Sequence, residues 1–148
     1  MKVLVQADDF NPQDLCDAMT MGRTDAGALT SFTGFVRGDD GLTSMTLEHY
    51  PAMTQKALEK IANEAMTRWD LMDLVVVHRY GRLLAGERIV FVATLSAHRT
   101  HAFEAAEFLM DWLKTKAPFW KLEEGTDGAH WVDAKATDDD AAKRWDKN

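Results

Sequence analysis

Cysteine is nearly absent from this sequence, since Cys16 is the only one among 148 residues. One thiol cannot form a disulfide within the chain, and a cysteine-rich metal site is excluded as well. We therefore expect a reducing, cytoplasmic setting. Cys16 lies beside the apolar stripe of a short predicted helix, so we expect it to be a packing residue rather than a reactive thiol.

Long apolar runs and an excess of positive charge are also missing. No apolar segment approaches the roughly 20 residues that span a bilayer, and the N-terminus turns acidic at Asp8 and Asp9, too early for a signal peptide. With 17 basic and 24 acidic residues, the formal net charge of −7 argues against a dedicated nucleic-acid binder. We expect neither a membrane nor a nucleic acid as partner, although a local cationic cleft still suits a small anion.

Common catalytic motifs are absent too. The sequence has no glycine-rich phosphate loop, no HExxH and no GxSxG. His98 and His101 lie close together near a predicted helix start, but no third ligand is evident, and two histidines leave a zinc shell incomplete. Any chemistry must therefore come from residues that are scattered along the chain.

What is present fits one soluble domain. The length suits a single core, and 46% hydrophobic with 28% charged residues is ordinary for a globular protein. Periodicity predicts strands over 2–6, 27–37, 44–50, 74–80, 89–95, 119–123 and 130–133, and helices over 11–20, 52–69 and 102–116. Gly34 indicates a bulge or a close backbone approach within its strand.

These elements predict an α+β fold. We expect a mixed, mostly antiparallel sheet, with the strands over 74–80 and 89–95 at its centre, two long helices and one short N-terminal helix. Residues 81–86 are expected to form a connection. The charged tail over 136–148 is expected to be either a weak helix or an arm that faces a partner.

Three lysines lie among bulky apolar residues in the segment 113–121. Lys114 and Lys116 precede a Pro-Phe-Trp sequence, and Lys121 follows it. A lysine that packs against such side chains is partly desolvated, which favours its neutral, nucleophilic form. The same lysines, if charged, would bind an anion.

Five basic residues lie at the ends of predicted elements: Arg37, His98, Arg99, Lys114 and Lys121. Arginine suits bidentate phosphate binding, lysine suits point-charge contact, and a helix N-terminus favours a bound anion. Each also has a structural alternative. Lys114 can complement the helix dipole, worth about 0.3–1 kcal/mol, and the arginines can form surface ion pairs of little value. Spacing alone does not show whether the five converge.

Several motifs match one family in order and spacing. They are Phe-Thr-Gly-Phe-Val-Arg at 32–37, Leu-Glu-His-Tyr-Pro at 47–51, His-Arg-Tyr-Gly at 78–81, Ser-Ala-His-Arg at 96–99, the run over 103–121, and the segments 131–135 and 141–145. From residue 27 onward the sequence resembles the catalytic (large) subunit of molybdopterin synthase. The first 25 residues carry little of the resemblance.

The resemblance implies an α/β-hammerhead fold, a central homodimer and no bound cofactor. It also implies a ubiquitin-like small subunit whose C-terminal Gly-Gly ends in a thiocarboxylate. Sulfur from that tail passes to cyclic pyranopterin monophosphate and forms the dithiolene of molybdopterin. A protein with a single, poorly placed cysteine must take sulfur from elsewhere, so the partner's thiocarboxylate suits this sequence.

The resemblance also implies roles for individual residues. Arg37, His98 and Arg99 would hold the phosphate and the pterin of the substrate, and Lys114 and Lys121 would be the catalytic lysines. The remaining residues expected to line the site are Phe35, Val36, Leu122 and Glu123. The family often has a basic residue where Phe35 and Leu122 stand, so this pocket is expected to be less cationic. Lys135 stands where the family can carry arginine and is a candidate to reach a neighbouring protomer.

Two other functions stay open at this stage. A non-catalytic module that docks a ubiquitin-like protein would tolerate loss of both lysines, yet would need the apolar groove near Phe119 and Trp120. An unrelated transferase for a phosphorylated small molecule would bind its ligand without any protein partner.

Overall fold

Two sheets and four helices form the part of the chain that the computed structural model describes, which is residues 1–39, 41–126, 128–132 and 136–147. The strands are β1 (Lys2–Gln6), β2 (Ala28–Phe35), β3 (Leu42–His49), β4 (Asp73–Arg79), β5 (Gly81–Leu84), β6 (Arg88–Ser96), β7 (Phe119–Gly125) and β8 (Gly128–Val132). The helices are α1 (Pro12–Thr20), α2 (Pro51–Arg68), α3 (Arg99–Thr115) and α4 (Ala136–Lys143), followed by a 3₁₀ turn over Arg144–Lys147.

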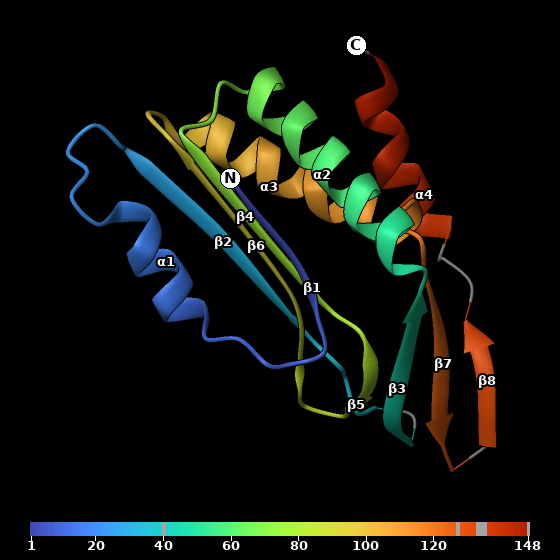
Figure 1. Ribbon diagram of the computed structural model, residues 1–148. Coiled ribbons are helices and arrows are strands. Elements are labelled where there is room, and N and C mark those ends of the chain that lie inside the picture. The colour runs from blue at the N-terminus through green and yellow to red at the C-terminus, as the bar shows by residue number, and fades with distance from the viewer. Residues whose placement is uncertain (40, 127, 133–135, 148) are drawn as a thin grey trace.

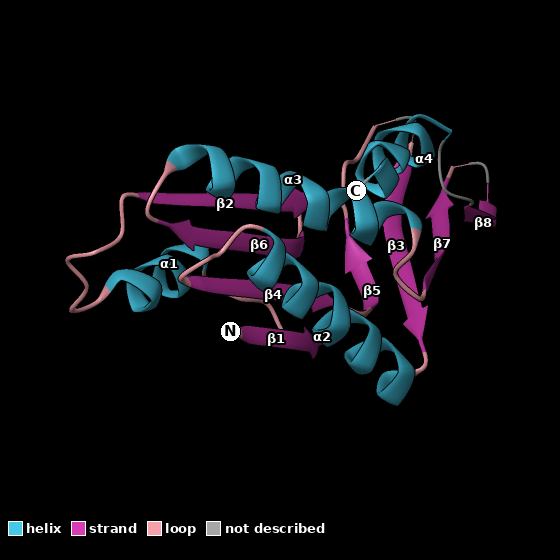
Figure 2. Ribbon diagram, turned by 90° about the horizontal axis from the view of Figure 1, so that it is seen from above, coloured by secondary structure: helices cyan, strands magenta, loops and turns pink. Residues whose placement is uncertain are grey.

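The main sheet has the strand order β1-β4-β6-β2, so the predicted central pair, β4 and β6, is confirmed. Only β1 and β4 run parallel among these neighbours. Helices α2 and α3 cover one face and α1 lies on the other, as Figures 1 and 2 show. In β4, Val75 and Val77 pack on the α1 side, whereas Leu74 and Val76 pack on the α2–α3 side. Burial of both faces explains why this strand is a continuous apolar run.

Helix starts agree with the local sequence. The Asn11 side chain accepts hydrogen bonds from the backbone N–H groups of Gln13 and Asp14, and Pro12 occupies the first turn of α1. Pro51 opens α2 in the same way. α3 begins at Arg99, three residues before its predicted start, because His98 already has the extended backbone of an N-cap residue.

The second sheet has the order β5-β3-β7-β8 and lies at one end of the main sheet (Figure 2). The chain crosses between the sheets after Gly34, where the β2–β6 register shifts. The predicted bulge is therefore confirmed. The close neighbour of Gly34 is a side chain and not another backbone, since a Cβ there would lie 2.7 Å from a Val90 methyl carbon. The crossing buries Val36 in a small apolar cluster with Leu47 and Leu83 of the second sheet.

The predicted α+β class is confirmed, including the two long helices, the short N-terminal helix and mostly antiparallel pairing. The strands divide into two sheets, however, and residues 81–84 form strand β5 instead of a connection. β5 was missed because it is only four residues long and pairs with β3 alone among its described neighbours.

The tail is helical and packs against its own chain. α4 contacts α3, and the Trp145 ring centroid lies 5.5 Å from that of Trp69 and 5.7 Å from that of Phe108. Lys135 lies outside the described residues. No helix within the described ranges is both long and apolar enough to cross a membrane.

Candidate active site

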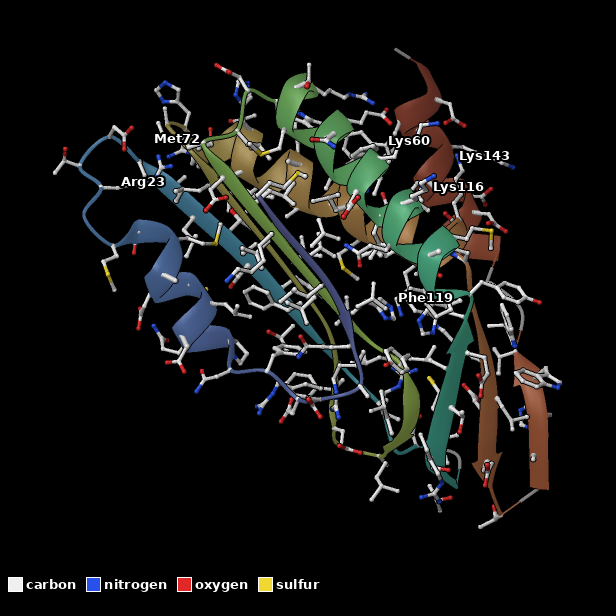
Figure 3. The ribbon with its side chains drawn as sticks, in the orientation of Figure 1. Arg23, Lys60, Met72, Lys116, Phe119 and Lys143 are labelled. Atoms are coloured by element: carbon white, nitrogen blue, oxygen red, sulfur yellow. The ribbon has the colours of Figure 1, made fainter. Side chains whose placement is uncertain are left out.

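Four aromatic side chains meet where the two sheets and the α2–α3 layer come together, and we call His49, His78, Tyr80 and Phe119 the aromatic cluster. The Phe119 ring stacks on His78 with centroids 4.0 Å apart and planes 16° apart. His49 lies 5.7 Å from Phe119 and 4.4 Å from Tyr80, again between ring centroids. Figure 3 places Phe119 where β3 and β7 approach the helices.

His78 is the buried member of this cluster and is electrically neutral. Its ring is 7% exposed, and its Nδ1 lies 2.9 Å from the carbonyl oxygen of Arg79. Burial lowers the pKa of His78 from 6.5 to about 4, with further lowering by the charges of Lys121, Lys114 and His49, while the bond to the Arg79 carbonyl acts in the opposite direction. The charges of both predicted catalytic lysines therefore act on one buried ring.

Lys121 reaches this place through the pairing of β7. It lies opposite Leu47 on β3, and it shares a strand face with Phe119, because alternate residues point the same way. The residue is half-buried. Lys121 thus meets the predicted condition of a lysine held against bulky apolar neighbours.

Lys114 lies in the last turn of α3 and Lys116 is the residue that caps its C-terminus, and both are exposed. The charge of Lys114 lowers the pKa of His78, whereas the Lys116 ammonium lies 3.7 Å from a carboxylate oxygen of Asp146. Figure 3 shows Lys116 beside α4. The two lysines at this helix end therefore have different surroundings. Of the two, Lys114 is the one whose charge acts on His78, as that of Lys121 does.

The segment after the Gly34 bulge also approaches the second sheet. Val36 is 2% exposed and packs with Leu47 and Leu83, so it is a core residue next to the second sheet. Phe35 is 57% exposed. The Arg37 Nε lies 3.0 Å from a carboxylate oxygen of Asp39, and both side chains are mostly exposed.

The two residues after Lys121 point in opposite directions. Glu123 shares the Lys121 face of β7, and its carboxylate lies 3.7 Å from Nε2 of His130 on β8. Leu122 lies on the other face, opposite Trp131. Of this pair, Glu123 is the residue on the side of the lysines.

His98 and Arg99 lie at the opposite end of α3. Both are exposed, and the N-terminus of the helix has no side-chain hydrogen-bond cap. At a rise of about 1.5 Å per residue, His98 and Lys114 are about 24 Å apart along the axis. The five predicted basic residues therefore do not share one cavity within a single chain. His98 and His101 belong to no group of potential metal ligands in the described ranges.

Neither His49 nor His78 was predicted to be a site residue. His78 directly follows the apolar Leu74–Val77 run, and a histidine in a buried strand row is the signal that was available. Cys16 behaves as expected, since it packs on the cluster that contains Phe10 and Phe91, on the α1 side of the main sheet. That face is opposite the one covered by α3.

Comparisons with known proteins agree with one another. The chain matches the family described as "MoaE protein" over residues 5–116. The molybdopterin synthase catalytic subunit of Mesorhizobium japonicum is 51% identical over 146 residues, which cover 97% of this chain and 92% of that protein.

Solved structures give the same result. The molybdopterin biosynthesis MoaE protein from Burkholderia ambifaria has a TM-score of 0.85 at 50% identity, over 99% of each chain. The molybdopterin synthase crystal structure from Staphylococcus aureus has a TM-score of 0.78 at 27% identity, over 87% of this chain and 95% of that chain.

Proposed function

This chain belongs to the MoaE protein family, and on that premise we propose that it transfers sulfur as the catalytic subunit of a molybdopterin synthase. The sulfur comes from the C-terminal thiocarboxylate of a ubiquitin-like small subunit, and cyclic pyranopterin monophosphate receives it in the cytoplasm. The observation that carries the proposal is the match to this family over most of the chain. Lys114, from α3, and Lys121, from β7, add support, because the charges of both lower the pKa of the buried His78.

The lysines supply the charge and the protons that the transfer needs. We assign Lys114 to activating the substrate carbon or stabilising the oxyanion that develops on the substrate. Lys121, half-buried against the apolar neighbours of β7, moves a proton or orients the thiocarboxylate. Each transfer breaks the carbon–sulfur bond of one thiocarboxylate, and water supplies the oxygen that leaves that tail as a carboxylate. The two sulfurs of the dithiolene therefore require two loaded tails.

An external sulfur donor is required by the position of Cys16. The thiol packs on the α1 side of the main sheet, whereas the lysines lie beyond the α3 side. A persulfide on Cys16 could not reach the lysines without passing through the core. A flexible tail from a partner needs no such path.

Phosphate binding is assigned to the N-terminus of α3. His98 and Arg99 are exposed there beside backbone N–H groups that lack a side-chain cap, which is a favourable setting for an anion. Their distance from Lys114 in the same chain requires that a second copy of the chain bring them to the lysines. A homodimer in which each copy lends this helix end to the other satisfies that requirement.

Mixed dimers test this sharing directly. Chains that carry Lys121→Ala are combined with chains that carry Arg99→Ala. If the site is shared, a mixed dimer keeps one intact site, and random pairing restores about a quarter of wild-type turnover. If each chain uses its own Arg99, every site carries a defect and no turnover returns.

The function is tested by reconstitution with thiocarboxylated small subunit and cyclic pyranopterin monophosphate. Lys114→Ala should abolish dithiolene formation while the melting temperature and the small-subunit Kd stay unchanged. Lys116→Ala is the matched control, because it removes a lysine from the same helix end that pairs with Asp146. Full turnover in Lys114→Ala would contradict the assignment of that lysine.

The same assay separates the two alternative functions. A docking module would bind the small subunit but would be indifferent to loss of both Lys114 and Lys121. An unrelated transferase would bind a phosphorylated ligand and show no response in a titration with the small subunit.

A further inference from the structure

His78 occupies a place where the strand pattern calls for an apolar side chain. In β4 the alternate residues Leu74 and Val76 face the α2–α3 layer, and His78 is next in that row. Its burial there, at 7% exposure, costs free energy that a valine or leucine would not. A polar ring in this row therefore needs an explanation beyond packing.

The contacts of the ring fix its orientation and its tautomer. Phe119 stacks flat on one face at 4.0 Å, which sets the plane of the ring. The Arg79 carbonyl oxygen can only accept a hydrogen bond, so Nδ1 carries the proton and donates across 2.9 Å. Nε2, on the side of the ring away from the backbone, therefore carries a lone pair and accepts.

The titratable groups that act on the ring come from three elements. They are Lys121 on β7, Lys114 on α3 and His49 on β3. Arg79, the next residue in β4, directs its guanidinium to the Ala7 and Arg88 carbonyl oxygens. Lys121 also shares its face of β7 with Phe119, the ring that stacks on His78, so the lysine side chain starts two residues from that contact.

His78 does not serve these lysines as a base. Because the pKa of His78 is about 4, the imidazole does not hold a proton near neutral pH and cannot take one from an ammonium group. A neutral acceptor in a site of low dielectric can instead hold an N–H group in one direction. That role needs the lone pair, the fixed ring plane and the absence of charge, and His78 has all three.

We propose that His78 is a positioning residue for Lys121, whose ammonium donates to Nε2 of His78 when the reacting groups occupy the site. This rests on the proposed function for its catalytic consequence. Phe119 takes part because it stacks on His78 and shares the Lys121 face of β7. The His78 ring thus makes two contacts in this proposal. It stacks on Phe119, which belongs to the strand that carries Lys121, and its Nε2 accepts the N–H of Lys121 itself.

Substitutions of His78 separate the lone pair from the packing. His78→Phe keeps a flat ring against Phe119 and removes Nε2, whereas His78→Gln keeps an acceptor near the Nε2 position and removes the stack. We expect His78→Phe to lower kcat about 10- to 100-fold with unchanged KM for the pterin substrate, since a misdirected catalytic group costs rate rather than binding. His78→Gln should recover most of that loss.

A merely structural role would give the opposite order. In that case His78→Phe would have full activity and His78→Gln would be the damaged variant, which would overturn the proposal. Thermal melts of both variants and their small-subunit Kd values identify losses that come from unfolding. Asn63→Phe, which adds the same ring at an exposed position of α2, is the control.

A second measurement does not depend on sulfur transfer. NMR of ¹⁵N-labelled histidine should show the Nδ1–H tautomer of His78 in the wild-type protein. Removing a nearby positive charge favours protonation, so Lys121→Met should raise the pKa of His78 above about 4, whereas Lys116→Met should not. An Nε2–H tautomer, or no response to Lys121→Met, would overturn the proposal even in a fully active enzyme. If the wild-type protein shows the Nδ1–H tautomer and the response to Lys121→Met but has no sulfur-transfer activity, the proposed function would be contradicted instead.

Discussion

The main sheet and the second sheet differ in what surrounds their strands. In the main sheet, helices cover both faces, and six consecutive β4 residues from Leu74 to Arg79 are buried. In the second sheet one face packs inward and the other is open, with Trp120 38% and Trp131 59% exposed. A sheet buried on both sides can contribute stability but has no surface for a substrate. In the second sheet, Lys121 lies on the inward face of β7 with Phe119, next to the end of α3, and this is where we propose the reaction.

This contrast assigns different consequences to substitutions in the two sheets. Core residues of the main sheet should affect the free energy of unfolding and leave the rate per folded molecule unchanged. Site residues of the second sheet should affect the rate and leave stability unchanged. His78 belongs to both, because its strand is in the main sheet and its ring contacts Phe119 of the second.

Within the second sheet, the largest effect is expected at Lys121. Lys121→Ala should lower turnover about 100- to 10,000-fold, which is the usual range for loss of a proton-transfer or oxyanion-stabilising group. Single-turnover assays with loaded small subunit measure the loss. Lys60→Ala, at an exposed position of α2, is the control. A loss of turnover below threefold in Lys121→Ala would contradict the claim that the second sheet carries a catalytic residue.

The largest stability effect is expected at Phe91 in the main sheet. Its ring is fully buried in the cluster on the α1 side, so Phe91→Ala should lower the free energy of unfolding by about 3–5 kcal/mol. Phe103→Ala, at a residue 60% exposed, should change it by less than about 0.5 kcal/mol. Urea unfolding measures both. Equal losses in the two variants would contradict the description of the main sheet as the stabilising core.

Acid pH should destabilise the protein through His78. Between pH 7 and pH 4 the unfolded chain gains a proton on this residue and the folded chain largely does not, since burial lowers the folded pKa to about 4. Stability therefore falls as pH falls through this window, by about 3 kcal/mol for a shift of this size. His78→Phe should lose about 3 kcal/mol less than wild type between the two pH values. Parallel pH curves for the two proteins would contradict this.

The smallest effect is expected in the tail. The Trp145 indole Nε1 donates to a carboxylate oxygen of Asp111 at 2.7 Å, and the ring packs on Trp69 and Phe108. Trp145→Ala should cost about 1–2 kcal/mol, because the side chain is only half-buried. Turnover per folded molecule should stay unchanged, since these contacts belong to the helix layer of the main sheet. Lys143→Ala, an exposed residue, is the control.

Local pattern was enough to predict most of the fold. The Leu74–Val77 run, the Pro12 and Pro51 helix starts and the bulge at Gly34 each depend on neighbours in sequence, and each is found in the structure. β5 was missed because its pairing with β3 is a long-range contact. The division into two sheets depends on the same kind of contact.

The site was less accessible to prediction. Lys114 lies near the end of α3 as predicted, whereas Lys121 lies within β7 and not at its end. The nearness of β7 to His78 depends on the stacking of Phe119 on that ring, which is a long-range contact. The separation of His98 from Lys114 follows from the length of α3, and the predicted helix over 102–116 was already long enough to indicate it. Only the assembly of two chains can decide whether that distance is bridged.

Photo-crosslinking from the small subunit's tail tests the central claim most directly. A diazirine-bearing residue is placed immediately before the C-terminal Gly-Gly, the complex is irradiated, and the linked residues are mapped by mass spectrometry. Because the lysines at the meeting of α3 and β7 receive the tail in this account, the links should fall within residues 110–125. Links confined to α1 or β1, with none in that range, would contradict it.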